Sequence, residues 1–166
     1  MVNSIEIKMD FTQFDKYFEK LQNFGDTGVE AAFRGTAQDA QSRLLREIKR
    51  NTKVGVPPDW ISEQTYADHW SGYTGGSLRD SWRLQGVQKK GNTYTCGAVT
   101  NLKYAPYYEF GHRQTPGRFV PAIGRKLKKG WVPGHFTARN ALADVKKLLP
   151  KIMAAQIKKE LQRYMR

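Results

Sequence analysis

The sequence KYAPYYEFGHRQTPGRFVPAIGRKLKKGWVPGHFTARNAL, residues 103–142, contains most of the unusual chemistry of this chain. Its first eight residues alternate in character, which is the period of a β-strand. Gly111 interrupts that pattern, and residues 111–136 are dense in glycine, proline, arginine, lysine and aromatic residues. A helical period returns at Thr137. The stretch therefore predicts a strand, a long basic loop and the start of a helix, in that order.

Two prolines and a threonine refine this prediction. Pro106 cannot donate to a β-ladder, so the strand over residues 103–110 should lie at a sheet edge or at a bulge. Thr137 is expected to be the N-cap of a helix that runs to the C-terminus. Pro150 should kink that helix or divide it in two, because its ring clashes with the preceding turn.

The N-terminal third predicts one strand and two helices. Apolar and polar residues alternate over residues 4–9, which is typical of a half-buried strand. Asp10 then fits the N-cap of a helix over residues 11–23. Residues 27–51 keep the three-and-four spacing of a helix with one apolar face, and the many alanines in that face would let another backbone approach closely.

Residues 52–76 show no sustained period, and we expect a long inserted loop there. This segment contains two tryptophans and two tyrosines, more than a disordered linker would have. We therefore expect much of it to pack, either on the core of its own subunit or on a neighbouring subunit.

A helical turn and a hairpin precede the opening stretch. Ser77 is expected to cap the turn over residues 77–82. Residues 82–88 and 92–100 form a hairpin around a KKG connection in which Gly91 takes positive φ. The predicted fold is thus an α+β domain spanning residues 1–166. A small antiparallel sheet of three to four strands, made of the hairpin and an edge strand, is packed by helices, with a long helix at the C-terminus.

Charge is strongly segregated along the chain. Residues 1–102 contain 13 Lys and Arg against 12 Asp and Glu, whereas residues 103–166 contain 15 against 3, which is +12 of the total +13. Solubility alone does not require such segregation. It indicates a polyanion or an acidic protein surface as the partner of the C-terminal third.

Composition limits the remaining classes. No run of about 18 apolar residues occurs, and the first ten residues lack the pattern of a secretory signal, so we expect neither a membrane span nor a signal peptide. Cys96 is the single cysteine, which excludes an intramolecular disulfide. We interpret it as a small apolar strand residue.

No constellation in the sequence carries catalysis, a cofactor or a metal. Candidate metal ligands are Glu109, His112, His135, His69 and Cys96, but they lack the tight pairs that zinc sites use, and we expect no metal site. His112 or His135 could act as the general base of a small nuclease, which would need one of them within hydrogen-bond reach of a substrate hydroxyl. There is no phosphate-binding glycine motif and no nucleophile elbow. We expect a protein that is not an enzyme.

What remains is a set of cations interleaved with rings. Such a set suits phosphate contacts with base stacking, and it equally suits docking on an acidic surface of a partner protein. The residues expected to make these contacts are His112, Arg113, Arg118, Phe119, Arg125, Lys126, Lys128, Lys129 and Trp131.

The order of three short motifs resembles a known family. Gly76, Leu78, Arg79 and Ser81 form a G-x-L-R-x-S turn before the hairpin. Tyr104, Ala105, Tyr107, Glu109, Phe110 and Gly111 follow it as Y-A-x-Y-x-E-F-G, and residues 130–136 read G-W-V-P-G-H-F. This order is similar to that of tailed-phage and prophage proteins of the minor-tail, tail-completion and head–tail joining kind.

The resemblance implies a virion structural protein at the neck between the head connector and the tail tube. It implies a ring of this chain, commonly of six subunits, on a compact α+β fold, with double-stranded DNA passing through and no membrane or small-molecule substrate. Two alternatives stay open on the residues themselves: a basic nucleic-acid-binding module that acts outside a virion, and a small nuclease that uses His112 or His135.

Overall fold

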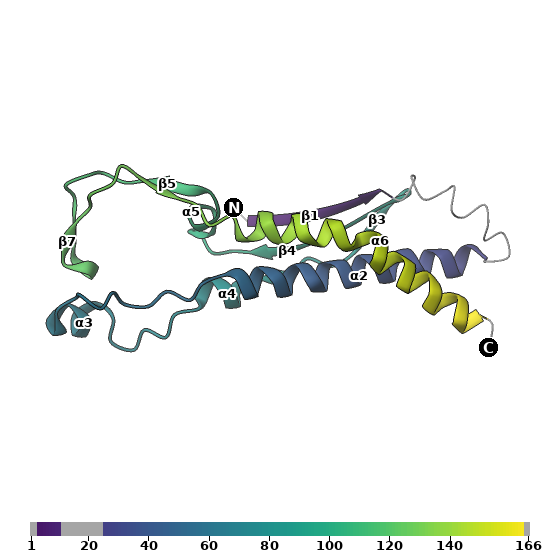
Figure 1. Ribbon diagram of the computed structural model, residues 1–166, viewed down its shortest axis with the longest axis horizontal. Coiled ribbons are helices and arrows are strands. Elements are labelled where there is room, and N and C mark those ends of the chain that lie inside the picture. The colour runs from purple at the N-terminus through teal and green to yellow at the C-terminus, as the bar shows by residue number, and fades with distance from the viewer. Residues whose placement is uncertain (1–2, 11–24, 165–166) are drawn as a thin grey trace.

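The computed structural model describes residues 3–10 and 25–164, and it confirms the α+β class. Two long helices, α2 (Asp26–Asn51) and α6 (Thr137–Tyr164), lie side by side along the body, with a small sheet against them (Figure 1). Two segments project together from one end of the body (Figure 1). The helix predicted over residues 11–23 lies outside the described residues, and Asp10 is the last residue of strand β1.

The sheet has four antiparallel strands with β4 in the centre. β1 pairs with β4 over its full length, from Asn3 opposite Thr100 to Asp10 opposite Thr93. The predicted hairpin is confirmed, with Gly91 at φ +59°, although Gly86 at φ +91° divides its first strand into two short pieces. The strands are β1 (Asn3–Asp10), β2 (Arg83–Leu84), β3 (Gln88–Lys90) and β4 (Thr93–Thr100).

The core lies between the sheet and the two helices. The predicted apolar face of α2 is buried, and α6 contributes buried alanines of its own at Ala138 and Ala141. Small side chains on both helices let the two backbones approach closely, and the rings of Trp82 and Tyr94 fill the space toward the sheet. The buried apolar residues of α2 are Ala32, Phe33, Ala37, Ala40, Leu44 and Ile48.

The prediction of a third strand over residues 103–110 is wrong. Ala105–Phe110 form a short helix, α5, and the strand at the sheet edge is β1. Pro106 lies in the first turn of α5, where the backbone N–H groups have no partner within the helix, so its missing N–H costs no hydrogen bond. Ala105 and Glu109 are both buried, and their spacing of four residues is that of a helix. The alternating aromatic residues of the sequence had indicated a strand instead.

The Ser77 cap is also wrong, because Ser77 is the first residue of α4 (Ser77–Ser81) and Gly76 takes the cap position at φ +81°. The rest of the motif anchors this turn to the sheet. Leu78 is buried, and the Ser81 hydroxyl bonds Leu78 O at 2.8 Å and Thr100 Oγ1 at 2.7 Å. Arg79 lies on the surface in an ion pair with Asp80.

The start of α6 is held by a residue from another helix. Glu109 Oε2 accepts hydrogen bonds from Thr137 Oγ1 at 3.2 Å and Ala138 N at 3.1 Å, and Oε1 accepts one from Arg139 N at 2.8 Å. The expected N-cap, Thr137, is therefore a donor to the capping group, and the cap itself is a buried carboxylate of α5. α6 continues through Pro150, and its ribbon changes direction near the middle (Figure 1).

Backbone contacts complete this junction between α5 and α6. His135 N donates to Tyr108 O at 2.9 Å, and Phe136 N donates to Glu109 O at 3.0 Å. A Cβ atom at Gly134 would lie 2.6 Å from the carbonyl carbon of Phe110, so only glycine lets the chain pass here.

Removal of the Glu109 carboxylate should destabilise the fold strongly. Glu109→Ala leaves two N–H groups at the start of α6 without their acceptor, and we expect a loss of about 3 kcal/mol in the free energy of unfolding. Glu160→Ala is the matched control, because Glu160 is also a buried carboxylate but lies near the opposite end of α6 and pairs only with the exposed Arg163. Its expected cost is about 1 kcal/mol. Urea unfolding followed by circular dichroism measures both, and equal losses would contradict the cap.

A second prediction compares substitution of a glycine in the crowded junction with substitution of a glycine that has free space around it. Gly134→Ala forces backbone atoms apart and should cost about 3 kcal/mol or more in the free energy of unfolding. Gly130→Ala should change it by less than about 1 kcal/mol, because the nearest atom to its Cβ would be Pro116 Cγ at 3.9 Å. Neither glycine has positive φ, so backbone preference does not confound the comparison.

Candidate functional site

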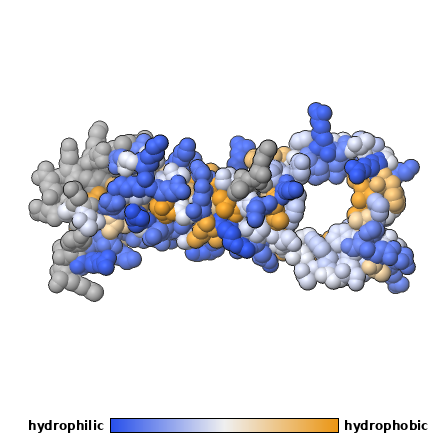
Figure 2. All heavy atoms as spheres, turned by 180° about the vertical axis from the view of Figure 1, so that it is seen from behind, coloured by the Kyte–Doolittle hydropathy of each residue, from blue (hydrophilic) through white to orange (hydrophobic). Residues whose placement is uncertain are grey.

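The two projecting segments are the candidate site, and we call them the basic ribbon (residues 111–136) and the aromatic segment (residues 52–76). Figure 1 shows both leaving the same end of the body. Figure 2, from behind, shows that they meet at their outer ends and that an opening remains between them and the body. Both were predicted as loops, and both contain regular structure.

The basic ribbon is a long hairpin of two short ladders. β5 (Gly111–Arg113) pairs with β8 (Trp131–Pro133), and β6 (Phe119–Val120) pairs with β7 (Arg125–Lys126). Gln114 N bonds Gly130 O at 2.9 Å between the ladders, and η3 (Pro121–Ile123) turns the chain at the tip. The cations of this segment are therefore carried on a backbone of fixed register.

The aromatic segment contains a short helix, α3 (Glu63–His69). Ser62 caps it, with its hydroxyl accepting a hydrogen bond from Thr65 N at 3.2 Å. No residue of α3 is buried. A helix with no buried face takes its position from contacts at its ends and with its neighbours.

Those contacts join the two segments at their tips. Trp70 Nε1 donates to Ala122 O at 2.5 Å, and the Arg125 guanidinium lies 3.9 Å from the ring centroid of Trp60. A cation over an indole face is attracted by the ring quadrupole. The aromatic segment thus packs on the ribbon of its own subunit, a surface that the prediction did not name.

The structure places most of the predicted contact residues on the surface of the basic ribbon. The six Lys and Arg residues are exposed, and the rings of Phe119 and Trp131 are 54% and 50% exposed. His112 differs, because it is half-buried beside Gln114, with its ring 5.8 Å from that of Tyr107. The exposed cations are Arg113, Arg118, Arg125, Lys126, Lys128 and Lys129.

The two segments have opposite charge. Residues 111–136 contain six Lys and Arg and no acid, whereas residues 52–76 contain three acids and one lysine, Lys53. Among the described residues, no cation of the basic ribbon and no acid of the aromatic segment takes part in an ion pair. These charges remain available to a partner.

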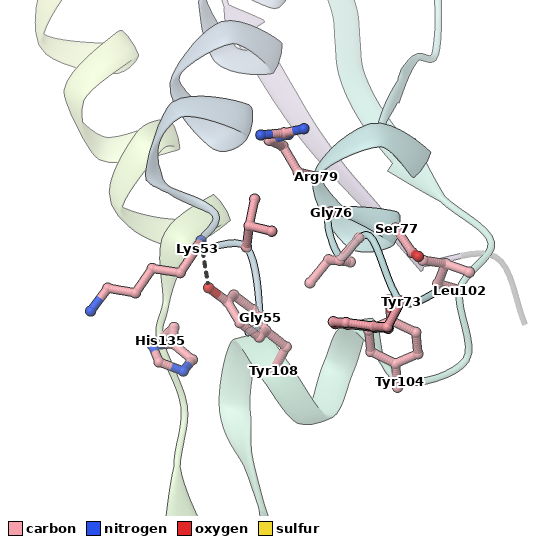
Figure 3. A pocket seen from close by; sticks show the side chains of 12 residues that line it. Lys53, Gly55, Tyr73, Gly76, Ser77, Arg79, Leu102, Tyr104, Tyr108 and His135 are labelled. Carbon is pink, nitrogen blue, oxygen red and sulfur yellow. Dashed lines mark hydrogen bonds between the residues drawn. The ribbon is translucent and has the colours of Figure 1, made fainter. Parts of the chain in front are cut away.

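An open groove of about 780 Å³ lies where the two segments join the body (Figure 3). Lys53 N donates to the Tyr108 hydroxyl at 3.0 Å, and the Tyr108 ring stacks on His135 with centroids 4.3 Å apart. The walls are largely apolar, with Leu78, Leu102 and aromatic side chains. This groove suits an apolar side chain of a partner better than a charged substrate.

The groups considered for catalysis are occupied in other ways. Glu109 caps α6 and is not available as a base beside His112. Burial raises the pKa of the Cys96 thiol to about 12, so this cysteine stays protonated. Among the described residues, no group of three or more His, Cys, Asp or Glu side chains could hold a metal ion. Nor is any described helix both long and apolar enough to span a bilayer.

Comparison with known proteins identifies the family. The family model HK97-gp10_like, described as "Bacteriophage HK97-gp10, putative tail-component", matches residues 12–111. No curated protein and no solved structure matches the chain. The match covers more than half of the chain, which belongs to this family of bacteriophage tail components. Membership implies a place in the virion and contacts with other virion proteins.

The tip contact gives a prediction for the two segments. Trp70→Phe keeps an aromatic ring but replaces the indole and removes the N–H that donates to Ala122 O, so the outer ends should separate while the core stays intact. We expect tryptic cleavage within residues 111–136 to accelerate several-fold, with the free energy of unfolding changed by less than about 1 kcal/mol. Tyr66→Phe, which removes an exposed hydroxyl from α3, should leave the cleavage rate unchanged. Equal rates in both variants would contradict the tip contact.

Proposed function

We propose that this tail component acts at the head–tail interface, as a tail-completion, neck or tail-terminator protein. Copies of the chain form a ring, commonly of six, between the head connector and the tail tube, and DNA passes through it. The basic ribbon and the aromatic segment make the contacts with neighbouring subunits and partners. The protein is structural and has no enzymatic role.

The observation that carries this proposal is the basic ribbon itself. A hairpin of defined register projects from the body and carries six exposed cations, none of them in an ion pair with a described residue. Keeping like charges close together costs free energy through self-repulsion, which a polyanion or an acidic surface would relieve. Aromatic residues and arginine are the side chains that dominate binding at protein interfaces.

A second candidate is nucleic-acid binding outside a virion. The cross-strand pairs Arg113–Trp131 and Phe119–Lys126 each place an exposed ring beside a cation, as in single-strand binding grooves. This candidate requires binding of the isolated chain to nucleic acid below about 1 µM, with an affinity that falls steeply with salt.

Neutralising the ribbon should impair joining of heads to tails and leave folding intact. We expect the variant Arg113→Gln, Arg118→Gln, Lys126→Gln, Lys128→Gln to lower the yield of infectious particles about tenfold or more in a phage that lacks the wild-type copy. The free energy of unfolding should change by less than about 1 kcal/mol, because all four side chains are exposed.

The control removes four exposed cations from α6, with Lys146, Lys147, Lys151 and Lys158 changed to Gln. It lowers the net charge equally and should keep particle yield near that of the wild type. Electron microscopy of lysates without functional protein should show filled heads and finished tails that are separate. Heads that lack DNA, or normal particles with the neutralised ribbon, would overturn the proposal.

A further inference from the structure

The aromatic segment carries three acids, residues 59, 63 and 68. Asp59, Glu63 and Asp68 are all exposed, and none is in an ion pair with a described residue. Asp68 accepts one hydrogen bond, from Gln64 Nε2 at 2.8 Å. The rings of Trp60 and Tyr66 lie in the same segment and are 46% and 47% exposed. We call these three acids and two rings together the acidic strip.

The outer face of the basic ribbon is its chemical complement. Cross-strand partners lie on one face of a ladder, and successive pairs alternate between faces. Val120 and Arg125 form one pair, and the contact of Arg125 with Trp60 shows that this face meets the aromatic segment. The next pair, Phe119 and Lys126, therefore points away from that segment.

Contacts within one subunit leave these two surfaces apart. The segments meet through the Trp70 hydrogen bond and the Arg125–Trp60 contact, and no ion pair joins them among the described residues. Each subunit thus presents, on different sides of its projecting end, a basic surface with exposed rings and an acidic surface with exposed rings.

We propose that the basic ribbon of one copy docks on the acidic strip of the next copy. This inference rests on the proposed ring and specifies its subunit contact. The contact is heterologous, so each copy uses one surface toward each neighbour, and such contacts build a ring when the rotation between neighbours closes. Opposite charges steer and align the surfaces, and the exposed rings on both sides form the apolar centre.

A second copy accounts for more of the structure than nucleic acid does. Nucleic acid would match the cations of the ribbon but would leave the acidic strip, on another side of the projecting end, without a partner. An acidic virion protein would likewise leave the acidic strip unused. Only a partner with both charges, arranged as in this chain, uses both surfaces.

Charge reversal tests the contact directly. The ribbon-reversed variant carries Arg118→Glu, Lys126→Glu and Lys128→Glu, and the strip-reversed variant carries Asp59→Lys, Glu63→Lys and Asp68→Lys. Sedimentation velocity at low salt should show association of the wild type, weakening as salt is added. Each reversed variant alone places like charges at the contact, and its association should weaken at least about tenfold.

Restored association is the decisive result. A chain with both sets reversed has complementary surfaces again and should associate as the wild type does. An equimolar mixture of the two singly reversed variants should also associate, because the copies can alternate around a ring of even number. Lys146→Glu, Lys147→Glu, Lys151→Glu on α6 makes the same charge change elsewhere and should leave association unchanged.

Several outcomes would overturn the inference. The first is a wild-type protein that stays monomeric at all concentrations. The second is a doubly reversed chain that does not recover association. The third is a ribbon reversal that abolishes DNA binding but leaves association unchanged. Failure here remains separable from failure of the proposed function. If the protein stays monomeric but neutralising its ribbon still impairs the joining of heads to tails, only this contact between copies is contradicted. If the protein self-associates but phage particles form normally without it, only the role at the head–tail interface is contradicted.

Discussion

The carboxylate of Glu109 is the interaction on which the arrangement of the projecting end depends. It ties the end of α5 to the start of α6, and the whole basic ribbon is the excursion of the chain between these two points. A helix N-terminus presents unpaired N–H groups and a partial positive charge, so an ionised carboxylate there satisfies both. Gly134 allows the backbones to touch at the same place. The two ends of the ribbon therefore leave the body side by side in a fixed direction.

Much of the fold was predictable from local patterns. The helix α2, the strand β1 and the hairpin around Gly91 each repeat one period for long enough to define their type. α5 was missed because six residues span less than two turns, and Pro106 is as compatible with a first helical turn as with a sheet edge. The Glu109 cap could not be predicted, because donors and acceptor are 28 to 30 residues apart and no helix-start pattern includes a residue so distant.

The candidate site divides in the same way. Exposure of the cations followed from their density and from the absence of acids in residues 111–136, and the structure places Arg118 and Lys126 on the surface. The sequence also indicated that Trp60 and Trp70 must pack. Their partners, Arg125 and the carbonyl of Ala122, lie more than 50 residues further along the chain and belong to a turn that the pattern did not reveal. The one usable signal was the presence of indole rings in a segment rich in glycine.

The family match ends at Gly111, the residue at which the ribbon leaves the body. The match therefore covers α2, the aromatic segment, strands β2 to β4 and α5, while β1 lies before it and the chemistry of the ribbon must be argued from this chain alone. The mutual repulsion of its six cations is weak because they are exposed to water, and salt screens it over a distance of about 8 Å. A surface of this kind gains most when its partner carries acids. The acidic strip of a second copy carries three exposed acids and two exposed rings, and it is the partner that we propose for the ribbon.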